Sequence, residues 1–296
     1  MSATITRTRH TIHAADFRSL TAYSHVPASA PAAHLVIAPG MAVGQHFYRD
    51  FADYLAGLGY QVWTYDYRGM NESAVGPMRE CTADLSDWCR LDTDAMVRHA
   101  HQAGAGVPVF LIGHSFGGQT APLLPCAGLL SGLVNIAVGS GAAHHNQPAT
   151  RRKAPLLWYV LVPLLSPLFG YFPGQRIGVI GDVPRRAMQQ WRRWCLTPDY
   201  LLTGAPGARA AYASARYPVL GLTFVDDELL LEAGSRMMHE AYTGTEVDYR
   251  ELGPQQVGLK RIGHFGFFKS SGEKTLWPIV GDWLGARCAA AQLAPA

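Results

Sequence analysis

The stretch Gly113-His114-Ser115-Phe116-Gly117-Gly118 directly follows the apolar run Val107–Ile112. A short apolar strand that ends in Gly-x-Ser-x-Gly and continues into a helical pattern is typical of a sharp strand-to-helix turn. The glycines let the backbone turn, and the serine lies at the apex with its hydroxyl exposed. The pattern therefore predicts Ser115 as a nucleophile, provided that a base and an acid follow it.

Candidates for both partners lie further along the chain, in the order acid then histidine that this arrangement requires. The apolar run Val219–Val225 is followed by three carboxylates. A carboxylate at the carboxyl end of a parallel strand lies on the sheet edge where the serine turn also opens. We predict Asp227 as the acid, with Asp226 as the alternative, because adjacent side chains point in different directions. Of the two later histidines, His239 lies in a helical pattern and is interpreted as a helix-surface residue, whereas His264 lies in a glycine-flanked loop and is the predicted base.

These three residue types are needed together for one chemistry. A serine hydroxyl is a poor nucleophile at neutral pH and needs a base within hydrogen-bond reach. An imidazole can take the proton and return it to the leaving group. A carboxylate on the other ring nitrogen fixes the tautomer and stabilises the imidazolium. The pattern therefore predicts acyl transfer through a covalent intermediate on Ser115.

The expected oxyanion hole uses two backbone N–H groups. One belongs to Phe116, the residue after the nucleophile. The second is expected in the loop after the strand His34–Ala38, where Gly40 allows a close backbone approach and Met41 offers its N–H.

Two further motifs carry a family resemblance. The segment Asp66–Ser73 resembles an Asp-x-Arg-Gly-x-Gly-x-Ser turn with Asn71 at the second glycine, a replacement that a left-handed backbone tolerates. Near the end of the chain stands Gly-His-Phe-Gly-Phe-Phe, residues 263–268. With the serine motif, these residues make the chain similar to α/β-hydrolases of the serine esterase, lipase and aminopeptidase type. It is particularly similar to bacterial proteins described only as predicted α/β-hydrolases. A departure is Pro39, where many members carry histidine. The resemblance implies the fold, the catalytic triad and acyl-transfer chemistry, but no substrate.

The alternation of strand and helix patterns predicts an α/β fold, with a mainly parallel sheet covered by helices on both faces. An opening hairpin is expected at Thr6–Ile12 and Arg18–His25. Further strands are expected at 34–38, 60–66, 107–113, 133–139, 218–225 and 245–251, and helices at 46–57, 82–102, 115–130, 228–242 and 273–290. We expect residues 1–141 and 218–296 to form the hydrolase core and residues 142–217 to form an inserted cap, or lid.

The expected cap is rich in aromatic residues. Trp191 and Trp194 share a helical face and are the candidate substrate-pocket residues, although packing is favoured over substrate contact as their role. Residues 154–175 carry no charge, but their prolines argue against a membrane span. We expect this stretch to pack on the domain or to form an apolar acyl pocket. Membrane contact, with Arg151-Arg152-Lys153 near anionic headgroups, is the alternative.

The remaining properties set limits on function. The chain has 296 residues, a net charge of +3 and five scattered cysteines, which we interpret as reduced thiols of a cytoplasmic protein. Nothing in the charge pattern points to nucleic acid, and the first 13 residues do not resemble a signal peptide.

The expected activity is that of a serine carboxylester hydrolase, acting on a small ester with an apolar part, without a metal or an organic cofactor. An acyltransferase with the same triad and a non-catalytic ligand receptor are the alternatives. A dinucleotide oxidoreductase is disfavoured because the third glycine of its fingerprint is missing.

Overall fold

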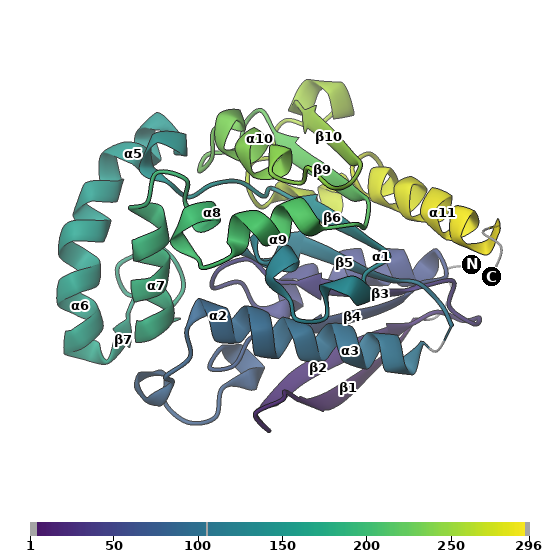
Figure 1. Cartoon of the computed structure of the whole chain (residues 1–296), viewed down its shortest axis with the longest axis horizontal. Helices are drawn as coiled ribbons and strands as arrows, with labels where there is room; N and C mark the ends of the chain where they lie inside the picture. Colours follow the sequence, from purple (N-terminus) through teal and green to yellow (C-terminus); the bar gives the residue numbers. More distant parts are fainter. Residues whose placement is uncertain (1–4, 105, 294–296) are drawn as a thin grey trace.

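The computed structural model describes residues 5–104 and 106–293, and its framework is one eight-stranded sheet (Figure 1). The spatial order of the strands is β1-β2-β4-β3-β5-β6-β9-β10. The first two form an antiparallel hairpin, β2 pairs antiparallel with β4, and the other six run parallel. The strands are β1 (Thr6–His13), β2 (Ser19–Val26), β3 (His34–Ala38), β4 (Gln61–Tyr65), β5 (Val109–His114), β6 (Gly132–Ile136), β9 (Val219–Phe224) and β10 (Val247–Leu252). The predicted hairpin and mainly parallel sheet are confirmed.

Helices cover both faces of the sheet because the central strands are buried on both sides. Every residue of β3, β5 and β6 is buried, which is typical of parallel strands between two helical layers. One face packs on α1 and α11, and the other packs on α3. The helices of this core are α1 (Arg49–Gly57), α2 (Leu85–Asp87), α3 (Asp94–Ala103), α4 (Phe116–Gln119), α10 (Glu232–Glu240) and α11 (Trp277–Leu293), with a π-helical segment, Trp88–Thr93, joining α2 to α3. The α/β prediction is confirmed.

The helix expected over 115–130 is the largest local departure from the sequence prediction. Only α4 forms there, and 3₁₀ turns follow at Ala121–Leu123 and Ala127–Leu129. Pro122 and Pro125 lack the backbone N–H that a continuing α-helix needs, so the helix ends before them.

Residues 142–217, called the insertion below, leave the sheet between β6 and β9. A helical stretch runs without a break through α5 (Pro148–Pro155), a π-helical segment (Leu156–Leu161) and α6 (Val162–Phe169). It lies beside α7 at one end of the molecule (Figure 1). The other elements are the short hairpin β7 (Tyr171–Phe172) and β8 (Val183–Pro184), and the helices α7 (Arg185–Cys195), α8 (Leu201–Gly204) and α9 (Ala208–Ser214). Among the described helices, none has both the length and the apolarity needed to cross a bilayer.

The sheet brings the loops of interest to one edge. Because β3, β5 and β9 run parallel, the loops after them all leave the sheet at the carboxyl ends of the strands. Ala38 at the end of β3 pairs with Gly113 near the end of β5, so the loop with Met41 lies beside the turn with Ser115. This edge is where ligands bind in open α/β sheets.

Candidate active site

Ser115 lies at the apex of a strained turn between β5 and α4. Its backbone has φ 50° and ψ −117°, a conformation that non-glycine residues rarely adopt. Close packing leaves no room for a side chain at the glycines around it. A Cβ on Gly113 would lie 2.2 Å from Gly118 Cα, one on Gly117 would lie 2.2 Å from the Ala38 carbonyl oxygen, and one on Gly118 would lie 2.4 Å from an Asn135 side-chain oxygen. The local sequence therefore packs the turn tightly enough to hold the serine in its strained conformation.

The imidazole of His264 is held by Asp227. Its Nδ1 lies 2.7 Å from Asp227 Oδ2, and both side chains are buried. The other carboxylate oxygen accepts the backbone N–H groups of Leu229, at 2.7 Å, and Leu230, at 3.0 Å. A carboxylate accepts but does not donate, so Nδ1 carries a proton and Nε2 is left as the basic nitrogen. This is the tautomer that a general base needs.

The neighbouring carboxylates hold the loop rather than the ring. The two oxygens of Asp226 accept the N–H groups of Ile262, at 2.9 Å, and Gly263, at 3.0 Å. Glu228 Oε2 accepts the N–H of His264 at 3.0 Å and pairs with Arg261 at 3.2 Å. The three consecutive acids thus fix one loop at successive positions, and only Asp227 reaches the imidazole.

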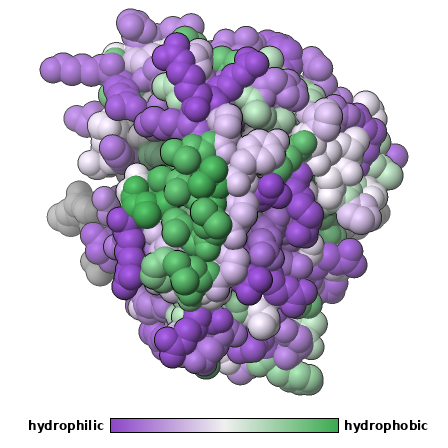
Figure 2. All heavy atoms as spheres, turned by 90° about the vertical axis from the view of Figure 1, so that its left-hand side faces the viewer, coloured by the Kyte–Doolittle hydropathy of each residue, from purple (hydrophilic) through white to green (hydrophobic). Residues whose placement is uncertain are grey.

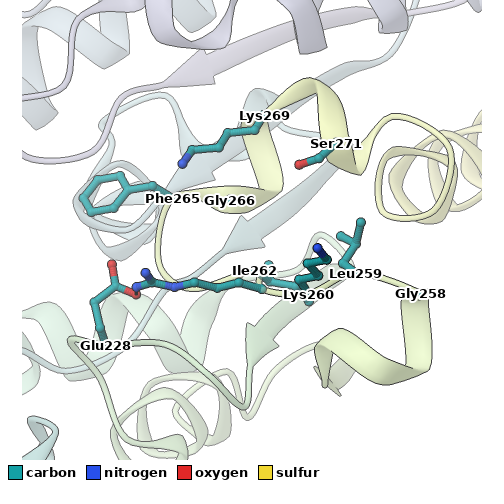
Figure 3. A pocket seen from close by; sticks show the side chains of 10 residues that line it. Glu228, Gly258, Leu259, Lys260, Ile262, Phe265, Gly266, Lys269 and Ser271 are labelled. Carbon is teal, nitrogen blue, oxygen red and sulfur yellow. Dashed lines mark ion pairs between the residues drawn. The ribbon is translucent and has the colours of Figure 1, made fainter.

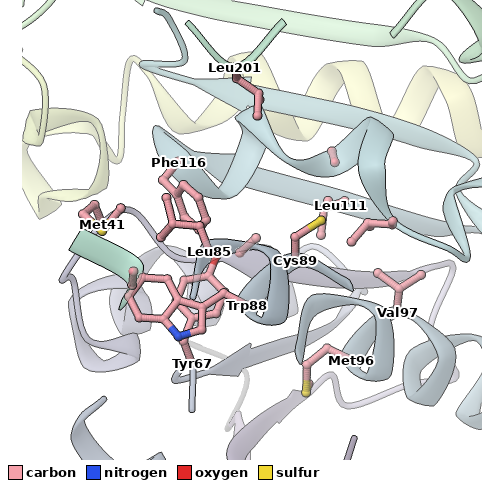
Figure 4. Packing of buried hydrophobic residues seen from close by; sticks show 14 of the residues in the cluster. Met41, Tyr67, Leu85, Trp88, Cys89, Met96, Val97, Leu111, Phe116 and Leu201 are labelled. Carbon is pink, nitrogen blue, oxygen red and sulfur yellow. The ribbon is translucent and has the colours of Figure 1, made fainter. Parts of the chain in front are cut away.

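The two expected oxyanion donors lie on adjoining loops. Phe116 begins α4, and Met41 follows the end of β3 against which α4 packs through Gly117. Within the described parts of the chain, neither N–H donates a hydrogen bond. Met41 and Phe116 belong to the same packed cluster, in which the Phe116 ring lies edge-on to the rings of Tyr67 and Trp88 (Figure 4). Tyr67 stacks on Trp88 with ring centroids 4.8 Å apart, and its hydroxyl donates to the Pro39 carbonyl at 3.0 Å. The loop before Met41 is therefore tied to the packed interior.

A buried hydrogen-bond chain joins this loop to the histidine loop. The N–H of Gly40 donates to Tyr48 Oη at 2.8 Å, Tyr48 Oη lies 2.8 Å from His114 Nδ1, and His114 Nε2 lies 3.1 Å from the His264 carbonyl oxygen. The carbonyl can only accept, so Nε2 of His114 carries the proton, and Tyr48 donates to Nδ1. Burial, with a smaller effect of His264, lowers the pKa of His114 to about 3. His114 is therefore neutral, and every polar atom of this chain has a partner.

The sequence alone indicates neither Tyr48 nor His114 as a member of this hydrogen-bond chain. No local pattern marks Tyr48, because its partner His114 is 66 positions away in the sequence. His114 lies inside the serine motif, but nothing in the motif shows that its ring turns inward. The residue type that points to this contact is the glycine at position 40, where a Cβ would lie 2.9 Å from His114 Nδ1.

Ser115 and His264 lie on neighbouring loops without a hydrogen bond between their side chains in the described structure. The ring of His114, the residue before the serine, lies 5.4 Å from the His264 ring, measured between centroids. Ser115 is partly exposed, whereas His264 is buried. Catalytic hydrogen bonds often tighten only when substrate is bound.

The interpretation of His239 as a helix-surface residue is wrong. Its ring is buried, with Nδ1 2.8 Å from the Ser235 carbonyl oxygen and Nε2 3.2 Å from Asn135 Nδ2. Space for the ring comes from Gly221 on β9, where a Cβ would lie 2.6 Å from Nε2. Burial lowers the pKa of His239 to about 4.

The insertion contacts the loop that carries Asp227 and the loop that carries Met41. At its start, Gln147 N donates to the Leu229 carbonyl at 3.0 Å, and Thr150 Oγ1 donates to the Glu228 carbonyl at 3.0 Å, beside the loop of Asp227. Further along, a Cβ on Gly181 would lie 3.0 Å from the Ala42 side chain, next to Met41. The insertion therefore touches the sheet edge from two sides.

Of the two tryptophans expected at the pocket, Trp194 is buried and Trp191 is half-buried. Trp191 Nε1 donates to Tyr200 Oη at 3.1 Å, and Tyr200 Oη donates to Gln119 Oε1, in α4, at 3.0 Å. Trp194 packs edge-on against the ring of Tyr200, with centroids 6.1 Å apart. These contacts join α7 to the helix behind the serine, and a substrate contact by either tryptophan stays a prediction.

A surface hollow of about 550 Å³ lies behind the histidine loop (Figure 3). Glu228 and Phe265 lie at one side and Lys269 at another, and neither Ser115 nor His264 lines it. It is therefore separate from the reacting groups. Among the described residues, no group of three or more His, Cys, Asp or Glu side chains could hold a metal ion.

The family model described as serine aminopeptidase, S33 (Hydrolase_4), matches residues 29–177, just over half of the chain. The chain belongs to this α/β-hydrolase family. The match spans the family's loop with Met41 and the turn with Ser115, and it ends before Asp227 and His264. No curated protein matches the sequence.

Solved structures share the α/β-hydrolase fold over nearly the whole chain. DcsB, solved with its substrate analogue, is 14% identical with a TM-score of 0.67, covering 96% of this chain and 99% of that one. Monoglyceride lipase from Saccharomyces cerevisiae is 16% identical with a TM-score of 0.63, covering 95% of each chain. The Pyrococcus furiosus esterase Pf2001 is 13% identical with a TM-score of 0.61, covering 95% and 93%. At these identities the likeness concerns the fold alone.

Proposed function

We propose that the protein is a serine hydrolase that cleaves a carboxylic ester with an apolar acyl or alcohol part. The observation that carries the proposal is the 2.7 Å contact of His264 Nδ1 with Asp227, on the sheet edge where the strained turn presents Ser115. This combination supplies a basic Nε2 on a loop neighbouring the partly exposed Ser115. A histidine with a purely structural role would need neither the buried carboxylate partner nor a strained serine beside it.

In the proposed reaction, Ser115 Oγ attacks the ester carbonyl while His264 Nε2 takes the hydroxyl proton. The Met41 and Phe116 N–H groups donate to the oxyanion, and the protonated His264 then gives its proton to the leaving alkoxide. Water, activated by the same nitrogen, attacks the acyl-enzyme and releases the acid. Asp227 keeps the ring oriented and stabilises the imidazolium throughout.

The proposed substrate class has two supports. The esterases and lipases among the solved structures share the fold. The inserted segment is also rich in apolar and aromatic residues, and it contacts the loops of Met41 and Asp227. We propose that residues 142–217 form a cap over the site, on a core made by residues 1–141 and 218–296. A cytoplasmic location stays a prediction.

The test is hydrolysis of p-nitrophenyl esters from acetate to palmitate, with Ser115→Ala as the paired variant. The proposal predicts turnover by the wild type with an optimum above acetate, and loss of at least about 10⁴-fold in kcat/KM for the variant. Equal rates for the two proteins would overturn it. Product analysis with added alcohol separates hydrolysis from acyl transfer, because a transferase would form the new ester in preference to the acid.

A further inference from the structure

The outer face of the insertion's longest helical stretch is apolar. Within Pro148–Phe169, the exposed residues from position 155 onward recur at helical spacing and include no charged side chain. Three of them are strongly exposed: Leu168 at 75%, Leu164 at 65% and Tyr159 at 63%. We call this set the outer stripe: Pro155, Leu156, Tyr159, Val160, Pro163, Leu164, Pro167 and Leu168. Figure 2 shows a continuous apolar patch surrounded by hydrophilic residues on the face of the molecule that this helix occupies.

The stripe is not the packing face of the helix. That face is formed by Ala154, Trp158, Val162 and Ser166, which are buried against the rest of the insertion. A surface helix ordinarily buries its apolar residues and turns charged ones to water. This helix is apolar on both faces, and a contiguous exposed apolar patch rimmed by polar residues marks an interaction site.

The net charge of the segment that carries the stripe indicates which kind of partner binds to it. Residues 142–217 contain ten Lys and Arg but only two acids, Asp182 and Asp199, a net charge of +8. Since the whole chain has a net charge of +3, the remaining residues carry −5. The positive charge is therefore concentrated in the segment that bears the stripe.

Cationic side chains lie along the length of the stripe. Arg151, Arg152 and Lys153 are exposed and precede the stripe, separated from its first residue only by the buried Ala154. The Arg192 guanidinium lies 5.6 Å from the centre of the Tyr159 ring, and the Arg176 guanidinium lies 5.6 Å from that of Phe169, at the far end. The outer stripe therefore has an apolar centre with cations along its length. Its chemistry is complementary to a surface that is apolar inside and anionic at its rim.

We propose that the outer stripe docks on an anionic lipid surface. The leucine and valine side chains would enter the boundary between headgroups and acyl chains, while the arginines and the lysine meet lipid phosphates. A second copy of the chain fits poorly, because self-association would bring together two regions of charge +8. The docking uses no residue of the proposed triad, so it does not depend on the proposed reaction.

The test is flotation of the full chain with vesicles of phosphatidylcholine, with and without phosphatidylglycerol. We expect binding to the anionic vesicles that weakens as salt rises, and much weaker binding to phosphatidylcholine alone. Combined Arg151→Gln, Arg152→Gln and Lys153→Gln changes, all at exposed positions, should lower the partition coefficient on anionic vesicles about a hundredfold. Combined Leu164→Asp and Leu168→Asp changes should abolish binding to both vesicles.

Two controls make the result specific. Leu58→Asp introduces the same kind of charge at an exposed leucine just after α1, in the half of the molecule away from α6 (Figure 1), and should bind like the wild type. Ser115→Ala should also bind like the wild type, so a failure of docking is distinguishable from a failure of the proposed chemistry. Melting curves report whether each variant is folded.

Three outcomes would overturn the proposal. The first is absence of wild-type binding to anionic vesicles. The second is undiminished binding by a folded Leu164→Asp, Leu168→Asp variant. The third is a wild-type dimer that the same two substitutions dissociate, because the stripe would then be an interface between copies of this chain.

Discussion

The histidine loop and the outer stripe depart from ordinary burial in opposite ways. Around His264, polar and charged groups are buried, and the hydrogen bonds of Asp226, Asp227 and Glu228 fix the loop. On the outer stripe, apolar side chains are exposed, and nothing in the described structure covers them. A buried polar group and an exposed apolar patch are the informative exceptions in a folded protein. The first kind holds a reacting group in position, and the second offers a surface to a partner.

The largest expected effect distinguishes the two adjacent aspartates of the histidine loop. Asp227→Asn should lower kcat about 10⁴-fold, because an amide that donates to Nδ1 favours the wrong tautomer of His264. Asp226→Asn should cost about 1–3 kcal/mol of stability with a far smaller loss in kcat, since it disturbs two N–H contacts of the loop. Ester kinetics and denaturant melts check both variants. Equal kinetic losses would contradict the division of roles.

A second comparison concerns the two tryptophans of α7. Trp194→Ala should destabilise the fold by about 3–5 kcal/mol, because the side chain is buried. Trp191→Ala should cost less stability and change the preference for acyl-chain length about threefold or more if the insertion lines the pocket. Melts and the ester series give both results. A Trp191→Ala variant with unchanged preference would assign this residue to packing alone.

A third comparison uses two buried tyrosine hydroxyls. Tyr48→Phe should leave Gly40 N–H and His114 Nδ1 without their partner, costing about 1–3 kcal/mol and loosening both site loops. We expect kcat to fall about tenfold with KM nearly unchanged. Tyr65→Phe deletes a buried hydroxyl that contacts Thr93 and neither site loop, and should lose stability while keeping kcat. A fall in kcat for both variants in proportion to stability would contradict a positioning role for Tyr48.

The last expected effect, absent at neutral pH, is a pH dependence of stability. Burial lowers the pKa of His239 to about 4, below its unfolded value near 6.5. The unfolded chain therefore binds a proton first, and the stability that the neutral ring contributes is complete above about pH 6.5 and falls as the pH drops toward 4. The expected slope is about 1.4 kcal/mol per pH unit for this group. In urea titrations, His239→Gln should lower the measured slope by this amount while His114, also buried and neutral, keeps its own contribution. An unchanged slope would contradict the assignment.

The sequence predicts most of the sheet because its strands are continuous apolar runs, such as Val107–Ile112 before the serine. It predicts Asn71 correctly at a left-handed position, since the structure gives φ 40° there. The helix expected after Ser115 is too long, because Pro122 and Pro125 cannot donate the backbone hydrogen bonds that the apolar pattern of these residues otherwise suggests. The sequence misplaces His239, because the space for that ring comes from a glycine on a neighbouring strand.

The residues of the candidate site likewise differ in how well the sequence predicts them. Ser115 and His264 lie in local motifs and can be found from sequence alone. The different contacts of Asp226 and Asp227 depend on how the loop folds back on itself, which no local pattern describes. Tyr48 and His114 become partners only through tertiary packing. The outer stripe is visible in the sequence as a stretch without charge, but its exposure is known only once the opposite face of the helix is seen to be buried.

Covalent labelling with a fluorophosphonate shows whether Ser115 is an activated nucleophile. We predict one adduct on the wild-type chain by intact mass, mapped to Ser115 by peptide analysis, and no adduct on Ser115→Ala. Asp227→Asn should be labelled far more slowly than the wild type. An adduct of equal extent on Ser115→Ala, or none on the folded wild type, would contradict the account.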